Sequence, residues 1–532
     1  MKTNSRLCWL VLTITCLLRF DLGAAGAGAR SPDHSDPEAI VRIDGGRVQG
    51  MAVPGGYVFR ALPYAAPPTG GLRWRAPQPP AEWRGVRDAT AFAPSCPQKI
   101  VFTGGPQDED CLYLNVYTPM LNHRDKALPV IVWIHGGGFT NGGARDYDAT
   151  KLAASGVVVV TINYRLGPLG FLAHPALASS PGGPSGNYGL MDQQAALRWV
   201  QFNIEGFGGD PENVTIAGQS AGGLAVLAHL VSRSSRGLFR RAIVQSGSFA
   251  LTQQPLAAAE AFGQSFAELV GCADQTAECL RSKSSDVLVE KFPDAAIPGV
   301  IDGRILTESI GTALAAGRFA RVPILNGTNH DEERIFVTLL GQFGLAVSGG
   351  TFVPVLEPLT AASYQRVIAS VLGVTDPRAA IIAAEYPLVA YPSPQIAFSA
   401  LSGDANFACT ALQMDGWTSQ RAPTFAYEFN DDATPYRYAP IVPPVATHLS
   451  ELPYLFDLPD APIQVPLNLD QEALAATMRT AWVNFAANGD PSSAAVPWPS
   501  FNGAHIMSLV PPQPEMVNDF ASRHHCSFWA SR

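Results

Sequence analysis

A serine between two glycines is the first pattern in the sequence that could do chemistry. Residues 218–222 read GQSAG and stand between an apolar β-branched run, 214–217, and a helix-forming run, 224–228. In such a pattern a sharp turn from strand to helix holds the serine hydroxyl out of the fold, and the glycines leave room where neighbouring backbone excludes a Cβ. Ser220 is therefore a candidate nucleophile. A serine hydroxyl is a weak nucleophile by itself, so the chain must also supply a base, an orienting acid and donors for an oxyanion.

A glycine run before this serine is a candidate oxyanion site. Residues 135–138 read HGGG and follow a continuously apolar run, 129–134, which is typical of a strand buried on both faces. HGGG-type loops of serine hydrolases offer backbone N–H groups to an oxyanion, together with the N–H of the residue after the nucleophile. The candidate donors are Gly137, Gly138 and Ala221. A tight glycine turn without chemistry is the alternative, and a phosphate or dinucleotide loop fits less well because its glycine spacing is absent here.

Five separated blocks together resemble the type-B carboxylesterase and cholinesterase family, in the order that the family has them. They are EDCLYLNVYTP at 109–119, HGGGF at 135–139, NYRLG at 163–167 with GFL at 170–172, NYG at 187–189 with Asp192 and Gln193, and GQSAGG at 218–223. The resemblance covers nearly all of the chain that remains after the N-terminal segment. It implies an α/β-hydrolase fold, in which helical insertions surround the active site.

The resemblance also implies an acid and a base after the serine, in the chain order of α/β hydrolases. Residues 327–333 read GTNHDEE and resemble the family's G-x-x-x-D-E-G motif, which assigns the acid to Glu332; Glu333 replaces the last glycine of the motif. Residues 448–456 read HLSELPYLF and resemble the family's catalytic-histidine block, which assigns the base to His448. Without the resemblance, an acidic run is more often a solvated loop, and a histidine is more often a surface or core residue.

Further residues take their roles from the same resemblance. Ser246, in the QSG at 245–247, resembles a serine that supports the triad through hydrogen bonding, and a polar strand end is the alternative. Six cysteines follow the N-terminal segment; an oxidising compartment favours disulfides, but spacing alone leaves the pairing open. The resemblance implies the pairs Cys96–Cys111, Cys272–Cys279 and Cys409–Cys526. No cysteine–histidine cluster has the spacing of a zinc site, and we expect neither a metal nor an organic cofactor.

The elements that position these residues follow from the distribution of apolar runs. Continuously apolar runs predict buried strands, and a stripe with helical spacing at 190–203 predicts a helix. Strands alternating with helical patterns indicate an α/β fold with a large, mostly parallel central sheet covered by helices on both faces. Two weakly patterned stretches, near 250–320 and 340–400, are interpreted as helical insertions. The strands are expected at 129–134, 157–162, 214–217, 242–246, 322–325 and 424–429.

The N-terminus has the pattern of a secretory signal peptide. Lys2 and Arg6 precede a twelve-residue apolar run, 7–18, and A-x-A at 27–29 is a suitable cleavage site. Twelve apolar residues are too few to span a bilayer comfortably, and no later run approaches the required length, so no stable membrane span is expected. We therefore predict a signal peptide at 1–29, one catalytic domain at 30–532, and secretion to the extracellular space or the periplasm.

The composition, and the residues that depart from the cholinesterase motifs, favour some classes of function over others. A net charge of −9 gives no cationic footprint for nucleic acid, and the expected partner is a small-molecule ester. We expect a serine carboxylic-ester hydrolase that forms an acyl-enzyme on short to medium acyl esters. A cholinesterase is disfavoured because no tryptophan lies between Cys96 and Cys111, and neutral Gln219 replaces the glutamate that precedes the nucleophile there. A lipase on longer chains is the nearest variant, and a non-catalytic adhesion protein is the alternative from another class; the oligomeric state stays open.

Overall fold

The computed structural model divides the chain into two units, residues 1–35 and 36–532. The smaller unit lies outside the described residues, and so does the predicted signal peptide at 1–29. Every feature below belongs to the larger unit. The described residues are 39–99, 105–121, 127–178, 180, 182–293, 299–340, 345–348, 351–355, 357–434, 445–459 and 465–530.

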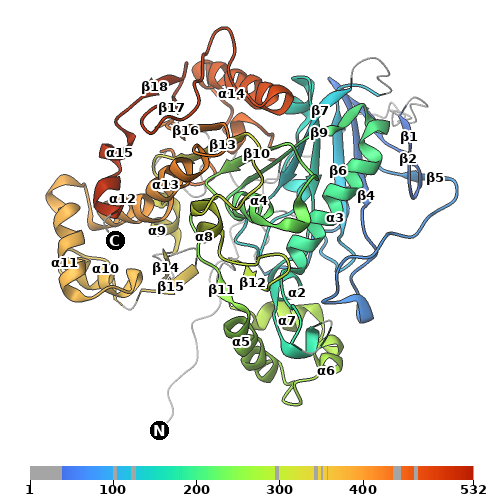
Figure 1. Ribbon diagram of the computed structural model, residues 1–532, viewed down its shortest axis with the longest axis horizontal. Coiled ribbons are helices and arrows are strands. Elements are labelled where there is room, and N and C mark those ends of the chain that lie inside the picture. Colours follow the sequence, from blue (N-terminus) through green and yellow to red (C-terminus); the bar gives the residue numbers. More distant parts are fainter. Residues whose placement is uncertain are drawn as a thin grey trace, which may run out of the picture. The chain divides into compact units, whose positions relative to one another are not determined.

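A sheet of eleven strands forms the centre of the described part of the chain (Figure 1), in the spatial order β18-β17-β16-β13-β10-β9-β7-β8-β6-β4-β3. The strands from β17 to β8 in this order run parallel, and antiparallel pairs lie toward both edges. The predicted α/β class with a mostly parallel sheet is therefore confirmed. The strands are β3 (Met51–Val53), β4 (Gly56–Pro63), β6 (Tyr113–Thr118), β7 (Leu128–Ile134), β8 (Val158–Ile162), β9 (Gly209–Gln219), β10 (Arg241–Gln245), β13 (Ile324–Asn329), β16 (Thr424–Phe429), β17 (Ile506–Leu509) and β18 (Glu515–Val517).

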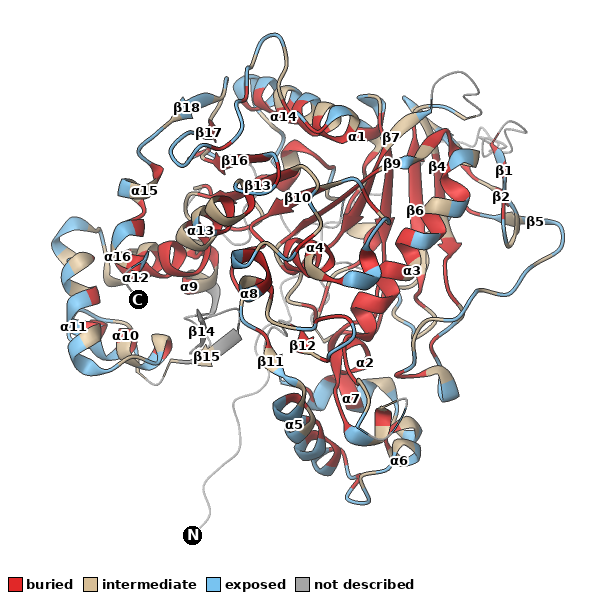
Figure 2. Cartoon of the chain, viewed as in Figure 1, coloured by how far each residue is buried: buried red, intermediate tan, exposed pale blue. Residues whose placement is uncertain are grey.

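Helices cover both faces of this sheet. They include α3 (Tyr188–Asn203), α4 (Ala221–Val231) and α14 (Leu469–Asn488), whereas another long helix, α5 (Leu256–Leu269), lies beside two short strands outside this sheet. Along β7, Val132 and Ile134 belong to the core that includes α3 and α4, whereas Ile131 and Trp133 belong to the core that includes α14. Because side chains of a strand alternate between the two faces, a strand covered on both sides needs apolar residues throughout. Figure 2 shows the central strands buried along most of their length.

The two weakly patterned stretches contain the predicted helices together with short strand pairs that the sequence did not indicate. The first holds β11 (Gln254–Pro255), α5, α6 (Ala277–Ser282), α7 (Ser285–Lys291), β12 (Val300–Ile301) and α8 (Ile310–Ala315). The second holds α9 (Arg334–Leu340), β14 (Leu345–Ser348), β15 (Thr351–Pro354), α10 (Tyr364–Leu372), α11 (Asp376–Glu385) and α12 (Pro394–Gly403). A π-helical turn, η8 (Asp404–Ala408), then joins α12 to α13 (Cys409–Thr418).

Smaller elements complete the described chain. A separate three-stranded sheet has the order β1-β2-β5, and two short helices end the chain. Among the described residues, no single helix has the length and apolar character to cross a membrane; one bent helix pair, Tyr364–Leu372 with Asp376–Ala390, meets that test by length and composition only. These elements are β1 (Ile40–Ile43), β2 (Gly46–Gln49), β5 (Val86–Asp88), α1 (Thr150–Ala154), α2 (Gly167–Phe171), α15 (Phe520–Arg523) and α16 (Cys526–Ala530).

The six cysteines form the three disulfides that the family resemblance implies. Cys272–Cys279 closes a short loop within the first insertion. Cys96–Cys111 joins two positions 15 residues apart in the segment that precedes β6. Cys409–Cys526 joins α13 to α16 across a sequence separation of 117 residues. This last bridge attaches the C-terminal helices to α13, the helix that follows the second insertion.

Candidate active site

Ser220 occupies a strained turn between β9 and α4. Its backbone has φ 59° and ψ −126°, a conformation that residues with a Cβ rarely adopt. A Cβ on Gly222 would lie 1.9 Å from the carbonyl oxygen of Ile134, and one on Gly218 would lie 2.5 Å from Gly222. The GQSAG glycines are therefore required by close backbone packing. The turn leaves Ser220 partly exposed, although Gln219 and Ala221 on either side are buried.

Free backbone N–H groups surround the candidate nucleophile. Gly137 and Gly138 follow β7 with φ of 97° and 62°, and their N–H groups donate no hydrogen bond within the described residues. A Cβ on Gly136 would lie 3.0 Å from the Cβ of Ser220, so the glycine run lies directly against the serine. Ala221 is the first residue of α4, and first-turn N–H groups have no partner inside a helix. The three predicted donors therefore lie on the two segments that meet at Ser220.

His448 and Glu332 meet as a buried pair. Nδ1 of His448 lies 2.5 Å from Oε2 of Glu332. The other carboxylate oxygen of Glu332 accepts hydrogen bonds from Thr328 Oγ1 and from the backbone N–H of Asn329, each at 2.8 Å. The backbone N–H of His448 also donates to the carbonyl oxygen of Glu332, at 3.2 Å. These contacts hold the carboxylate in one orientation, with one oxygen toward the ring.

The structure distinguishes the two adjacent glutamates. Glu333 makes no bond to His448; its Oε1 accepts from Asn406 Nδ2 at 3.4 Å, and its Oε2 has no partner within the described residues. Burial, with a smaller effect of the negative Glu332, raises the pKa of Glu333 to about 8 even though the Asn406 hydrogen bond lowers it. Glu333 is therefore protonated at neutral pH, and Glu332 alone of the two contacts His448, the candidate base.

The Nε2 side of His448 contacts a residue that the sequence singled out for another reason. Nε2 of His448 lies 3.2 Å from Nε2 of Gln219, and no hydrogen bond joins His448 to Ser220 within the described residues. Phe336 and Phe407 lie beside the ring, with centroid distances of 5.0 and 5.3 Å. The sequence had identified Gln219 only as a neutral residue that disfavours cationic substrates, because sequence alone gave no distance to His448.

Ser246 and Glu451 are two further buried polar residues, each within a segment that the motifs singled out. Ser246 is buried with φ 49°, and its Oγ makes no hydrogen bond within the described residues, so its supporting role stays a prediction. Glu451 was not predicted; it accepts from Gln245 Nε2 at 3.1 Å and from Asn329 Nδ2 at 2.7 Å. Asn329 thereby links Glu451 to the loop of Glu332. The H-x-x-E spacing after His448 was the signal that could have identified it.

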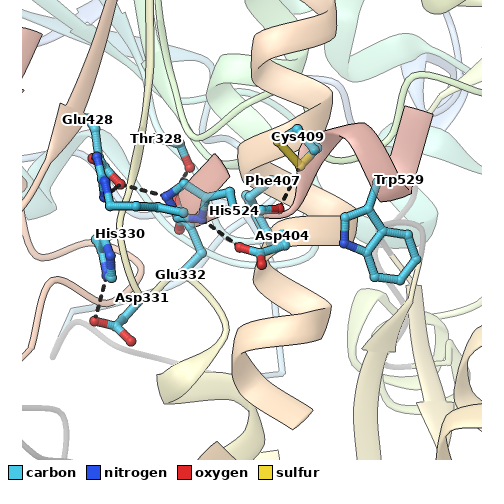
Figure 3. A network of polar contacts seen from close by, with 12 residues as sticks. Thr328, His330, Asp331, Glu332, Asp404, Phe407, Cys409, Glu428, His524 and Trp529 are labelled. Carbon is cyan, nitrogen blue, oxygen red and sulfur yellow. Dashed lines mark hydrogen bonds and ion pairs between the residues drawn. A yellow bond between two sulfur atoms is a disulfide. The ribbon is translucent and has the colours of Figure 1, made fainter. Parts of the chain in front are cut away.

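A second buried histidine network is built around His524 (Figure 3). His524 binds Asp404 through Nδ1 at 2.5 Å and Glu428 through Nε2 at 2.7 Å. Burial lowers the pKa of His524, but the two carboxylates outweigh it and raise the pKa to about 9. His330, Glu428 and His524 are close enough to share a metal ion. In the described contacts both ring nitrogens of His524 instead face carboxylate oxygens, which makes a network of ion pairs.

The site and the sheet together define the class of protein. A strained serine turn after a parallel strand, followed along the chain by a carboxylate and a histidine bonded to it, is the arrangement of an α/β hydrolase. The described residues therefore fit the fold that the motifs implied.

Comparisons with known proteins identify the family. A model of the carboxylesterase family matches residues 37–529. Pyrethroid hydrolase Ces2e of Rattus norvegicus is 35% identical, over 98% of this chain and 93% of its own length. Para-nitrobenzyl esterase of Bacillus subtilis (strain 168) is 35% identical, over 88% of this chain and 94% of its own. A solved structure of PNB esterase has a TM-score of 0.76 at 31% identity, covering 92% of this chain and 99% of that chain.

The chain belongs to the carboxylesterase family. It is a carboxylic-ester hydrolase, as the relatives with names of esterases and hydrolases support.

Proposed function

We propose that Ser220, His448 and Glu332 form the catalytic triad of a secreted carboxylesterase. The observation that carries this proposal is the 2.5 Å contact between His448 Nδ1 and Glu332 Oε2, next to the strained serine turn. A carboxylate at Nδ1 fixes the tautomer whose Nε2 accepts a proton, and it stabilises the imidazolium that forms. Ser220 then attacks the ester carbonyl while His448 Nε2 takes the hydroxyl proton.

The reaction runs through an acyl-enzyme. The N–H groups of Gly137, Gly138 and Ala221 stabilise the oxyanion of the tetrahedral intermediate; loss of one such donor typically costs about 10²–10³ in rate. Protonated His448 delivers its proton to the leaving alcohol, and the acyl group stays on Ser220 Oγ. Water then attacks the acyl-enzyme with His448 again as base, which releases the acid and restores the serine.

The substrate is a small neutral ester with a short to medium acyl chain. Two relatives are named pyrethroid hydrolase and para-nitrobenzyl esterase, which supports a small-molecule ester as the substrate. Phe336 and Phe407 beside the base favour an apolar substrate. The buried neutral side chain of Gln219 offers no charge to a quaternary ammonium group. A lipase-like preference for longer chains is the competing specificity.

The three disulfides favour an oxidising compartment, in keeping with the signal peptide predicted at residues 1–29. The proposal therefore includes secretion, with residues 30–532 as one catalytic domain. N-terminal sequencing of protein from the medium or periplasm of an expressing host tests it. A mature start near residue 30 is expected, and a retained Met1 contradicts it.

Hydrolysis of p-nitrophenyl esters of graded chain length tests the catalytic proposal. The wild type is compared with Ser220→Ala and with Ser234→Ala, which removes a hydroxyl that bonds Ser232 and Gln194 away from the site. Ser220→Ala should lose roughly 10⁶-fold in kcat, the loss typical of a removed nucleophile, and Ser234→Ala should keep wild-type rates. Equal rates in all three proteins contradict Ser220 as nucleophile. Rates that rise toward long acyl chains favour the lipase variant.

A further inference from the structure

Gln219 donates a hydrogen bond to the atom of His448 that must accept the serine proton. Gln219 ends β9 and is fully buried, and its Nε2 lies 3.2 Å from His448 Nε2. Glu332 occupies the other ring nitrogen, Nδ1. An ionised carboxylate can only accept, so Nδ1 carries the proton and Nε2 of the neutral ring can only accept. The amide of Gln219 can therefore serve as donor at the position where the hydroxyl of Ser220 would donate.

The other end of the same amide is an unused acceptor. Oε1 of Gln219 is buried and has no hydrogen-bond partner within the described residues. A Cβ on Gly136 would lie 3.1 Å from it, so the glycine leaves the oxygen room. A primary amide presents a donor in one orientation and an acceptor after a half-turn, whereas a carboxylate presents acceptors only. Glutamine at this position can thus serve both protonation states of the ring, and glutamate would favour the charged one.

We propose that Gln219 is a positioning residue that holds His448 as a neutral base in the free enzyme and yields Nε2 to Ser220 when the ester binds. The proposal rests on the triad of the proposed function. In the first step the Ser220 O–H proton passes to His448 Nε2, the bond from Oγ to the carbonyl carbon forms, and the carbonyl electron pair moves to the oxyanion. Gln219 gains and loses no proton. It sets the starting tautomer and orientation of the ring.

Apart from position 219 itself, the charged surroundings of His448 are the same in any Gln219 variant. Glu332 bonds the ring directly, and Glu333, Glu451 and Tyr427 are buried titratable groups that interact with Glu332. The aromatic neighbours, Phe336 on α9 and Phe407 on η8, are uncharged. A change in pH dependence on substitution at position 219 therefore reports the contact between the amide and the ring.

The pH dependence of p-nitrophenyl acetate hydrolysis tests the proposal. Gln219→Glu replaces the donor with an anion beside Nε2, which should favour the imidazolium and move the acidic limb of kcat/KM upward by about one pH unit or more. Gln219→Met removes the donor without adding charge, and the limb should move upward by about half a unit. The matched control is Gln194→Met, because Gln194 is a buried glutamine whose amide bonds Ser234 and Ser235. Its pH profile should coincide with that of the wild type.

The outcomes separate this inference from the triad on which it rests. The positioning role is supported if the acidic limb of kcat/KM lies at the highest pH in Gln219→Glu, lower in Gln219→Met and lowest in the wild type. A merely structural defect would instead lower kcat/KM by the same factor at every pH. Coincident limbs for both variants, or a uniform loss of rate without displacement, overturn it while Ser220→Ala remains inactive. If Ser220→Ala keeps activity, the triad itself is wrong and the Gln219 proposal falls with it.

Discussion

Two buried histidines share the type of partner at Nδ1 and differ in the partner at Nε2. His448 and His524 each bind a carboxylate through Nδ1 at 2.5 Å, to Glu332 and Asp404 respectively. At Nε2, His448 meets the amide of Gln219, whereas His524 meets a second carboxylate, that of Glu428. A neutral partner leaves Nε2 able to gain and lose a proton. A second carboxylate keeps the proton in place, and the ring becomes a fixed cation.

Protonated His524 connects the C-terminal helices to η8 through Asp404 and to β16 through Glu428. Arg523, next to His524, also donates to Glu428, at 2.6 Å. Asp404 accepts on its other oxygen from Tyr386 Oη at 2.7 Å, and the Cys409–Cys526 bridge lies beside the cluster (Figure 3). A histidine whose Nδ1 is paired with a carboxylate therefore occurs in two different settings in this protein. We infer that the second partner decides whether the ring can act as a base, as proposed for His448, or forms a structural clasp, the ion-pair cluster of His524 with Asp404 and Glu428 that Arg523 also joins.

Among changes to the partners of the two histidines, the largest effect is expected on kcat when the carboxylate partner of His448 is neutralised. Glu332→Gln keeps the shape of the side chain but removes the anion that orients and stabilises the imidazolium, so kcat should fall about 10⁴-fold. Glu333→Gln changes the adjacent, already neutral group and should leave kcat almost unchanged. Steady-state rates on p-nitrophenyl acetate for both variants measure this. A large loss in Glu333→Gln with a small one in Glu332→Gln would reverse the assignment of the acid.

Neutralising a carboxylate of the clasp should instead affect stability. Glu428→Gln leaves His524 and Arg523 without one buried anion, and breaking a buried ion pair typically costs about 3–5 kcal/mol. The matched control is Glu385→Gln, whose carboxylate bonds the neighbouring His525 at the surface, with both side chains about a third exposed. Such a pair is worth about 0–1 kcal/mol. Urea unfolding followed by tryptophan fluorescence measures both; similar losses in the two variants contradict the clasp.

The difference in unfolding free energy between the wild type and Glu428→Gln should itself depend on pH. The pKa of His524 is raised from 6.5 to about 9, so its stabilising effect is complete below pH 6.5 and is lost as pH rises through about 9. The pKa of Glu428 is lowered from 4.5 to about 2, because burial, which raises it, is outweighed by His524 and Arg523. Its effect is present above pH 4.5 and is lost toward pH 2. The free-energy gap between wild type and Glu428→Gln should therefore be widest from pH 4.5 to 6.5, and a gap that stays constant to pH 10 counts against the network.

The sequence predicted the sheet and the reactive motifs because each is local. Buried parallel strands read as unbroken apolar runs, and the glycines around Ser220 are dictated by backbone packing within a few residues and against β7. Boundaries were less accurate: the run at 322–325 begins as a strand only at Ile324, after Pro323, which has no N–H to donate. The predicted pairing of cysteines rested on the family, since spacing alone left it open.

The contacts of Gln219 with His448, and of Asp404 and Glu428 with His524, could not be predicted from the sequence. The contact of Gln219 with His448 spans 229 residues, and the clasp of His524 joins residues 120 and 96 positions away. No local pattern marks such pairs, because the fold alone decides which side chains share a buried layer. Asp404 is one example: it reads as an ordinary polar residue, yet it lies in the π-helical turn η8 and faces His524.

The smallest expected effect concerns a buried carboxylate without any cation. Glu333 contrasts with Glu332 and Glu428, each of which binds an imidazole. Its pKa of about 8 against 4.5 when exposed means that the folded state must keep a proton that the unfolded chain releases, so folding weakens as pH rises from 4.5 to about 8. Glu333→Gln keeps the Asn406 contact and removes that penalty. It should match the wild type at pH 4.5 and exceed it by on the order of 2 kcal/mol at pH 6.5 in urea unfolding. A variant that is no more stable than the wild type at pH 6.5 would show that the folded state does not hold Glu333 protonated, and the rule that a buried group takes its charge from its partner would fail at this position.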